Sequence, residues 1–258
     1  MTRMIRGIQT TAIAPTLVAL SLLLQPAQAQ QPSVSLPGDL LQNTADIGAN
    51  FDDICRVAAI AGACAAITSC AGLPVCDTQT KTVFLTTEEF TGDLVAEAGS
   101  PPFEVPCAGV TDGIAAADCI CQTLADQADL TGTYKAWIAA SDDATSPAAR
   151  FIFLNAPFAE RGQTTPIADN WADLTDGSIS SPLDTWENGS GSPSVVGVWT
   201  NVEPQGQSAG SDNCQAWQSD SSSDRAVIGV SGYSDMGWTY KLPLEGCARP
   251  NHLYCFEQ

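Results

Sequence analysis

The chain has 258 residues, of which 29 are Asp or Glu and 10 are Lys or Arg, so its formal net charge at pH 7 is −19. A chain this acidic repels polyanions at long range, which excludes nucleic acid and heparin as partners. Ten residues are cysteine and one is histidine, so the sulfur chemistry is the first feature that needs an explanation.

The first 29 residues have the three parts of a secretory signal peptide. Arg3 and Arg6 supply a positive start, the apolar stretch "AIAPTLVALSLLL" follows, and small residues form a cleavage site that ends at Ala29. The apolar stretch is shorter than the ~20 residues that a membrane-spanning helix needs. We therefore expect a secreted or periplasmic protein, cleaved near Ala29 and without a membrane span.

An even number of cysteines behind a secretion signal predicts a disulfide framework. Cys55, Cys64, Cys70 and Cys76 lie in a small, apolar segment that is typical of a short helical hairpin, preceded by a polar linker; together these make up residues 30–79. Two disulfides among these four cysteines allow three connectivities. A zinc site is not expected, because the chain has no CxxC pair and a single histidine.

The main domain is predicted to cover residues 80–258. The β-branched and aromatic run "KTVFLTT" predicts a strand over 81–87. Residues 113–130 predict a helix, because apolar residues recur along one face at helical spacing. That face consists of Ile114, Ala117, Cys121, Leu124, Ala125 and Ala128. Gly132 ends the helix, and the alternating "TYKAWIAAS" predicts a second strand.

Residues 140–195 are rich in Ser, Thr, Pro, Gly and Asp, which predicts long loops. They surround one amphipathic piece, "IADNWADL", which we expect to bury Trp171 and Leu174. Short strands return at "VVGVWT", "AVIGVSG" and the closing "HLYCFE". Few helices, short strands and long structured loops indicate an α+β domain.

Two cysteines of the predicted helix point in different directions. Cys119 and Cys121 are two residues apart, so they lie about 200° apart around a helix that turns ~100° per residue. Cys121 lies on the apolar stripe and faces the core. Cys119 faces away, towards the loop that carries Cys107.

Four segments of the domain, in the same order along the chain, resemble the endostatin domain. "GIAAADCICQTLADQADLTGTYKAWIAAS" is similar to its first helix and the strand that follows, and "NWADLTDG" is similar to its Trp-containing helix. "VWTNVEPQGQSAGSDNCQAWQ" and "CARPNHLYCFEQ" resemble its Cys-x-x-Trp segment and its closing strand. The chain is also similar to a bacterial secreted domain family of unknown function with the same fold. The resemblance covers residues 80–258 and implies a C-type-lectin-like (endostatin-like) fold, stapled by disulfides and carrying long loops.

The resemblance further implies two disulfides. Cys121 on the first helix would pair with Cys255 on the last strand, and Cys214 would pair with Cys247. The last strand would then lie inside the sheet beside the first strand, and a long-range crosslink would hold it there.

Lectins of this fold offer a calcium-dependent sugar site as one hypothesis. They carry a Glu-Pro-Asn or Gln-Pro-Asp triplet, and the corresponding triplet here is Glu203-Pro204-Gln205. The proline would fix the loop so that carbonyl oxygens of Glu203 and Gln205 converge on a hard cation. The second half of the lectin site, a Trp-Asn-Asp triplet, is not matched, because no acid or amide follows Trp238. A surface turn is therefore the alternative interpretation, and calcium is the one cofactor considered.

Other chemistry has less support from the residues. Asp169, Asp173 and Asp176 do not have the spacing of an EF-hand loop, so we interpret them as solvated acids. A Ser–His–Asp arrangement would have to use His252, and the "GVSGYSD" around Ser231 is not a Gly-x-Ser-x-Gly elbow. Carboxylates are abundant but scattered, so they locate no acid/base pair. We do not expect an enzyme.

The residues favour recognition instead. Aromatic side chains in or beside the long loops could stack on a sugar ring or anchor a protein partner, although most of them are expected in the core. They are Trp186, Trp199, Trp217, Trp238, Tyr233 and Tyr240. The candidate ligand-binding residues are Glu203, Gln205 and Trp238. We expect a secreted, non-catalytic protein that binds an extracellular protein or a glycan; the alternatives are a structural module of an envelope or matrix assembly, a calcium-dependent lectin and a hydrolase.

Overall fold

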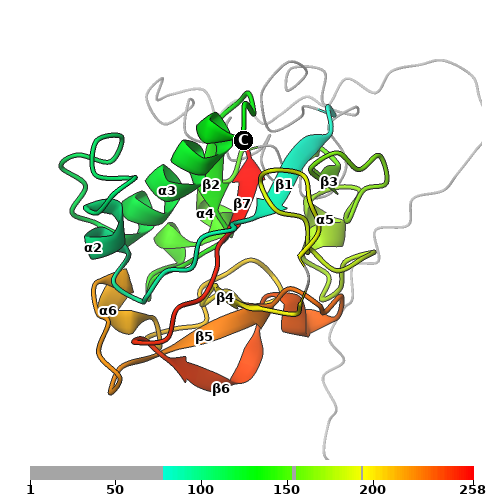
Figure 1. Cartoon of the computed structure of the whole chain (residues 1–258). Coiled ribbons are helices and arrows are strands. Elements are labelled where there is room, and N and C mark those ends of the chain that lie inside the picture. The colour runs from blue at the N-terminus through cyan, green and yellow to red at the C-terminus, as the bar shows by residue number, and fades with distance from the viewer. Residues whose placement is uncertain (1–77, 153–154, 193) are drawn as a thin grey trace, which may run out of the picture. The chain divides into compact units, whose positions relative to one another are not determined.

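The computed structural model describes residues 78–152, 155–192 and 194–258. The predicted signal peptide and the segment that holds Cys55, Cys64, Cys70 and Cys76 lie outside the described residues. Along the chain (Figure 1) the elements are β1 (Lys81–Leu85), α2 (Leu94–Ala98), α3 (Gly113–Gln127), β2 (Tyr134–Ala136), η5 (Asp143–Thr145), α4 (Pro147–Arg150), β3 (Phe158–Glu160), α5 (Trp171–Leu174), β4 (Gly197–Trp199), α6 (Cys214–Trp217), β5 (Arg225–Val230), η6 (Met236–Trp238), β6 (Lys241–Gly246) and β7 (Tyr254–Glu257).

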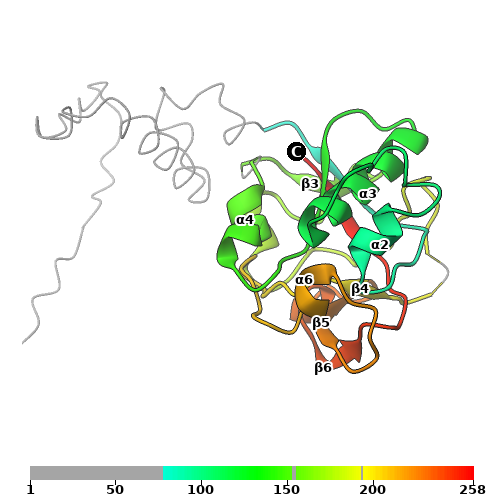
Figure 2. The same cartoon turned by 90° about the vertical axis from the view of Figure 1, so that its left-hand side faces the viewer.

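In the part of the chain that the structure describes, helices and strands mix in an α+β arrangement with two β-sheets. The first sheet has the strand order β2-β7-β1-β3, in which β7 is antiparallel to both neighbours and β1 is parallel to β3. The second sheet, β4-β5-β6, is antiparallel. Helix α3 runs beside the first sheet, and Figures 1 and 2 show the second sheet below it.

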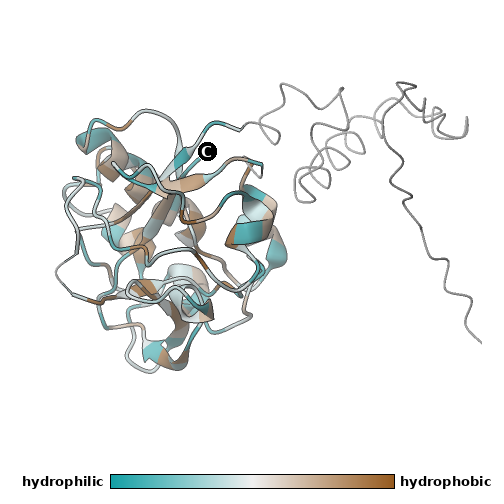
Figure 3. Cartoon of the chain, turned by 90° about the vertical axis from the view of Figure 1, so that its right-hand side faces the viewer, coloured by the Kyte–Doolittle hydropathy of each residue, from teal (hydrophilic) through white to brown (hydrophobic). Residues whose placement is uncertain are grey.

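The closing strand lies in the middle of the first sheet, between β1 and β2. Its side chains alternate between two apolar cores, as a strand requires. Phe84 and Cys255, which face each other across β1 and β7, belong to the core on the α3 side. Tyr254 and Phe256 belong to the core on the other face. Because both faces of these strands are covered, their sequences are almost continuously apolar; Figure 3 shows the apolar residues concentrated inside the domain.

Helix α3 forms where the apolar stripe predicts it. The side chain of Asp112 caps its first turn by accepting a hydrogen bond from Ala115 N at 2.9 Å. Cys121, Leu124 and Ala125 of the predicted stripe are buried, and so are the neighbouring Ala116 and Ile120 of the same helix. The stripe therefore predicts the buried face of this helix correctly, although the helix ends at Gln127 rather than near residue 130.

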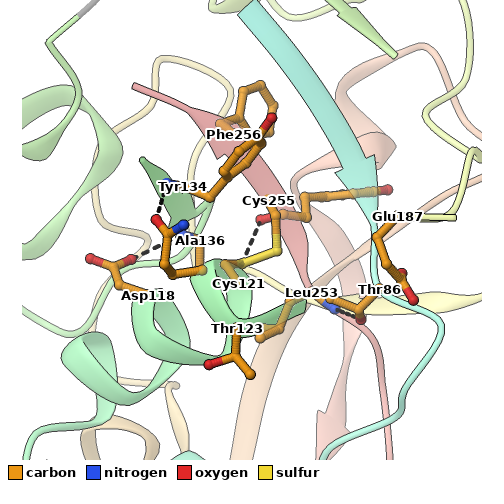
Figure 4. The surroundings of a disulfide bond; sticks show 12 residues. Thr86, Asp118, Cys121, Thr123, Tyr134, Ala136, Glu187, Leu253, Cys255 and Phe256 are labelled. Carbon is orange, nitrogen blue, oxygen red and sulfur yellow. Dashed lines mark hydrogen bonds between the residues drawn. A yellow bond between two sulfur atoms is a disulfide. The ribbon is translucent and has the colours of Figure 1, made fainter. Parts of the chain in front are cut away.

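The same helix also covers the outer edge of β2. Asp118 on α3 accepts a hydrogen bond from the backbone N–H group of Ala136 at 2.9 Å (Figure 4). Gln122, one turn further along α3, accepts one from the backbone N–H group of Tyr134 at 2.9 Å. Within the described chain β2 has β7 as its only strand neighbour, so these side chains take the place of a further strand.

The predicted strand over "TYKAWIAAS" is shorter than expected. Only Tyr134–Ala136 lies in the first sheet. Trp137 N still donates to Tyr254 O of β7 at 2.9 Å, and the chain then reaches the end of β4, where Ala139 N donates to Thr200 O at 2.9 Å. The apolar residues that follow β2 are buried because they lie between the two sheets, not because they alternate within one.

Three disulfides connect distant parts of the described chain. Cys107 is bonded to Cys119, with a sequence separation of 12. Cys121 is bonded to Cys255 across 134 residues (Figure 4), which ties α3 to β7. Cys214 is bonded to Cys247 across 33 residues. The last two are the pairings that the resemblance implies.

The pairing of these six cysteines fits an extracellular or periplasmic protein, since such compartments are oxidising. Within the described parts of the chain, no helix combines the length and the apolar character needed to cross a bilayer.

Candidate functional site

Half of the exposed large hydrophobic side chains among the described residues gather at one place beside the second sheet. The described residues include six such side chains in all: Val105, Ile152, Val195, Tyr233, Met236 and Leu242. Tyr233, Met236 and Leu242 line a single hollow of about 300 Å³ next to the start of β6. We call it the β6 hollow; its lining residues are Tyr233, Asp235, Met236, Gly237, Tyr240, Lys241 and Leu242.

The one-turn helix η6 shapes one wall of this hollow. Asp235 begins the turn, and its Oδ1 accepts a hydrogen bond from Gly237 N at 2.9 Å. Trp238 at the end of the turn is fully buried among the aromatic rings of the core, with its ring centroid 4.9 Å from that of Trp137. Since Trp238 anchors the turn inward, Met236 projects outward and remains 49% exposed.

Tyr233 packs closely against the same turn. A Cβ atom added at Gly237 would lie 2.4 Å from Cδ2 of Tyr233 and would force the ring to move, so the glycine allows the ring to approach the backbone. Tyr233 is 37% exposed. The ammonium group of Lys241 lies over its ring, 4.6 Å from the centroid.

Two charged side chains border the hollow, and they differ in their partners. The carboxylate of Asp235 caps η6. The ammonium of Lys241 lies 3.5 Å from the hydroxyl of Tyr233, and within the described residues it forms no ion pair with a carboxylate.

The triplet that the calcium hypothesis uses forms a tight turn. Gly206 N donates to Glu203 O at 2.8 Å, and Glu203 N donates to Gln207 O at 2.9 Å. Gly206 packs against Trp171, where an added Cβ would lie 2.7 Å from the ring. Gln205 is exposed and Glu203 half-buried. The structure thus agrees with the surface-turn interpretation, and among the described residues no group of three or more His, Cys, Asp or Glu is placed to hold a metal ion.

Trp238 does not share a surface with Glu203 and Gln205. Its side chain is 0% exposed, so its ring offers no face to a ligand, and we correct its assignment as a ligand-binding residue. Its role is structural, because its large apolar surface anchors η6 in the core.

Two of the other five candidate aromatics are also buried. Trp199 and Trp217 are 0% exposed, and their Nε1 atoms donate to Phe90 O at 2.8 Å and to Ala139 O at 2.9 Å. Trp186 is half-buried and packs against His252, with ring centroids 5.1 Å apart. Tyr233 is exposed and Tyr240 half-buried, and both line the β6 hollow.

The acids around α5 have structural roles. Asn170 caps this helix by accepting from Asp173 N at 3.1 Å, and a carboxylate oxygen of Asp173 accepts from Asp169 N at 2.7 Å. Trp171 and Leu174 are buried, as predicted. The carboxylate of Asp173 therefore helps to shape the turn that holds Trp171, while Asp169 and Asp176 are exposed, as the solvated-acid interpretation expects.

The residues considered for a Ser–His–Asp arrangement are engaged elsewhere. His252 is 4% exposed, with Nδ1 2.8 Å from Thr86 O and Nε2 3.4 Å from a carboxylate oxygen of Glu89. Ser231 is fully buried, and its Oγ accepts from Val196 N at 3.1 Å. The hydrogen bonds given for His252 and Ser231 do not join these two side chains to each other.

A second hollow lies at the beginning of β5 and is polar. Its lining residues are Ser211, Asp212, Gln215, Ser223, Asp224 and Arg225. Asp224 already accepts hydrogen bonds from Gln215 at 2.7 Å and from Ser219 at 2.5 Å. None of the exposed large hydrophobic residues lines it, so the β6 hollow is the better candidate for recognition.

Comparison with known proteins gives no relative that would assign a function to either hollow. No family model matches the chain, and no curated protein matches it either. The candidate site therefore rests on the geometry alone.

Proposed function

We propose that this chain is a secreted, non-catalytic recognition protein that binds an extracellular protein or a glycan through the β6 hollow. The observation that carries the proposal is the grouping of Tyr233, Met236 and Leu242 around one hollow. Val195 extends the group, since its side chain lies against Gly232, next to Tyr233. Apolar side chains scattered singly over a surface need no explanation, but a contiguous group is a mark of an interaction site.

The proposal includes a C-type-lectin-like (endostatin-like) fold for residues 80–258. Three features support it: β1 and β7 pair in one sheet, Cys121 joins α3 to Cys255 of β7, and Cys214 is bonded to Cys247. The signal-like residues 1–29 support secretion or transfer to the periplasm. The proposal assigns no calcium site, since Glu203 O already accepts a hydrogen bond from Gly206 N within a tight turn.

A site-specific photo-crosslinker tests the proposal directly. Benzoylphenylalanine placed at Met236 in the secreted protein should yield a covalent adduct with an extracellular partner. The matched control is the same amino acid at Val105, which is 78% exposed but lies on the loop held by the Cys107–Cys119 bond. Adduct formation from position 236 and not from position 105 is the expected result.

A glycan array, run with and without a calcium chelator, covers the other class of ligand. A glycan bound through the β6 hollow should be lost in the double variant M236S/L242S, whose substitutions are at exposed positions. If position 236 gives no adduct and no glycan binding depends on Met236 and Leu242, the proposed function is wrong.

A further inference from the structure

We propose that the ligand of the β6 hollow is a protein segment that presents one large apolar side chain next to a single carboxylate. This inference rests on the proposed function and specifies the chemistry of the partner. The apolar side chain would fill the hollow between Met236 and Leu242, and the carboxylate would bind the ammonium group of Lys241.

The position of Lys241 is the reason to expect a carboxylate in the ligand. Its ammonium group is held beside the hollow by the Tyr233 ring, at 4.6 Å, and by the Tyr233 hydroxyl, at 3.5 Å. Neither contact neutralises its charge, and no described carboxylate pairs with it. In a chain with a net charge of −19, a cation without an acidic partner at the rim of an apolar hollow is available to an incoming anion.

The surrounding charge limits the ligand to one carboxylate. Asp235 borders the same hollow, and the chain as a whole is acidic. An acidic run would be repelled by these charges, whereas a single carboxylate gains from contact with Lys241 and adds little repulsion.

The aromatic geometry favours a protein segment over a glycan. A sugar needs an open aromatic face to stack on, but one face of Tyr233 is occupied by the Lys241 ammonium and its edge packs against Gly237. Tyr240 is half-buried. The most exposed side chains of the hollow are Leu242 and Met236, at 54% and 49%, and flexible aliphatic and thioether groups suit the apolar side chains of a protein.

The open edge of β6 is not suited to binding the partner as an added β-strand. β6 has β5 as its only neighbour in the described sheet, so one edge of β6 is open. However, Pro243 lies within the strand and has no N–H group to donate to an added strand. Side chains in the hollow, rather than backbone hydrogen bonds, would therefore carry the binding.

Selection of peptides on the intact protein tests this inference. Random dodecapeptides displayed on phage would be selected on the disulfide-bonded protein, and the enriched peptides synthesised and titrated by fluorescence polarisation. We expect the enriched sequences to share one Asp or Glu adjacent to Leu, Ile, Phe or Met. Leu242→Ser should weaken their binding at least tenfold, and Lys241→Gln about three- to tenfold.

The matched control for the charge is Arg225→Gln. Arg225 is exposed, begins the neighbouring strand β5 and forms no ion pair with the described residues. Its replacement by Gln removes one positive charge, as Lys241→Gln does, but at a position outside the β6 hollow. Binding should remain within twofold of the wild type in this variant. Urea unfolding of all three variants checks that each one folds.

Three outcomes of the peptide experiment would overturn the inference. The enriched peptides could lack an acidic residue, their binding could be unchanged in Lys241→Gln, or no peptide could be enriched at all. A dimer of the wild type that Leu242→Ser dissociates would likewise show that a second copy, not an acidic segment, covers the hollow. In each case the identity of the adduct from position 236, together with the glycan array, decides separately whether the proposed function stands.

Discussion

Glu160, at the end of β3, is a buried carboxylate that organises a loop. It is 8% exposed, and its Oε1 accepts hydrogen bonds from the backbone N–H groups of Asp184 at 2.6 Å and Thr185 at 2.7 Å. Burial raises the pKa of Glu160 above its ordinary value of 4.5, while these two hydrogen bonds act in the opposite direction. Burial also raises the pKa of Tyr254, and the negative charge of Glu160 adds to that shift. The protein thus keeps a carboxylate where its charged form is disfavoured.

The sign of the shift predicts how Glu160 affects stability with pH. A folded-state pKa above 4.5 means that the folded chain binds the proton more tightly than the unfolded chain. The contribution of Glu160 to stability is therefore greatest below pH 4.5 and is lost as the pH rises through the folded-state pKa. In Glu160→Gln the amide oxygen can still accept both hydrogen bonds, and no proton is lost.

We expect the melting temperature of Glu160→Gln relative to the wild type to increase as the pH rises above 4.5 and then to level off. Thermal unfolding of both proteins between acidic and neutral pH measures this difference. Because every other acid is common to the two proteins, their titrations largely cancel. If the difference in melting temperature between Glu160→Gln and the wild type does not change with pH, or is largest in acid, the pKa of Glu160 is not raised in the folded protein.

Individual residues of the candidate site were only partly predictable. Trp238 and Tyr233 are both aromatic and close in sequence, but one is buried and the other is exposed. Hydrophobic periodicity needs a longer window than the three residues of η6, so it cannot say which of Met236 and Trp238 faces inward. A local feature of the sequence could have indicated these directions. Asp235 followed by "MGW" suits a capped turn, and a cap fixes the direction of the residues after it.

At the scale of elements, α6 has an unusual backbone that depends on a neighbour. Cys214, Gln215, Ala216 and Trp217 have φ values of 52°, 55°, 58° and 64°, so four consecutive residues without glycine are left-handed. Each such residue costs about 1–2 kcal/mol. The turn is held at its ends by the Cys214–Cys247 bond and by the hydrogen bond from the indole of Trp217 to Ala139 O.

Gly113, the first residue of α3, packs directly against this turn. A Cβ atom added there would lie 2.2 Å from Ala216 O and 2.6 Å from Cβ of Trp217. In a helix a change from glycine to alanine normally stabilises by about 0.5–1 kcal/mol. The contact at Gly113 is with the backbone of a turn that is fixed at both ends. We therefore expect alanine at this position to destabilise the protein.

Gly113→Ala should lower the free energy of unfolding by about 1–3 kcal/mol, which is the usual cost of overpacking. Urea denaturation measures the change. Gly191→Ala is the matched control, since an added Cβ at that position meets no atom within 4 Å. A stabilised Gly113→Ala protein would show that α3 and α6 can move apart.

The elements that sequence predicted best are those with a long apolar pattern. α3, β1, β5 and β7 lie where the apolar stripe and the β-branched runs placed them. β6 was not predicted, because "KLPLEG" contains Pro243, a residue that a strand tolerates at an edge of the sheet, where β6 lies. The left-handed α6 was not predicted either, because it depends on α3 and the disulfide rather than on its own residues.

At the scale of the whole molecule, the central position of β7 depends on contacts far apart in the sequence. Cys255 on β7 is bonded to Cys121 on α3, and on either side β7 pairs with β1 and β2. The resemblance implied this long-range bond, whereas composition and periodicity indicated only that a closing strand exists. Register and strand order are set by tertiary packing, which one sequence does not display.

The three disulfides should differ in how much they stabilise this arrangement. In the chain-entropy model the stabilisation grows with the loop that is closed, giving about 5 kcal/mol for Cys121–Cys255, about 4 for Cys214–Cys247 and about 3 for Cys107–Cys119. Replacing each pair by alanine should therefore lower the urea midpoint most for the first pair and least for the third. The Cys214–Cys247 pair also holds the left-handed turn, so its removal should in addition weaken the packing of Gly113. An equal loss for all three pairs, or the largest loss for Cys107–Cys119, would mean that native-state contacts and not chain closure dominate the effect of these bonds.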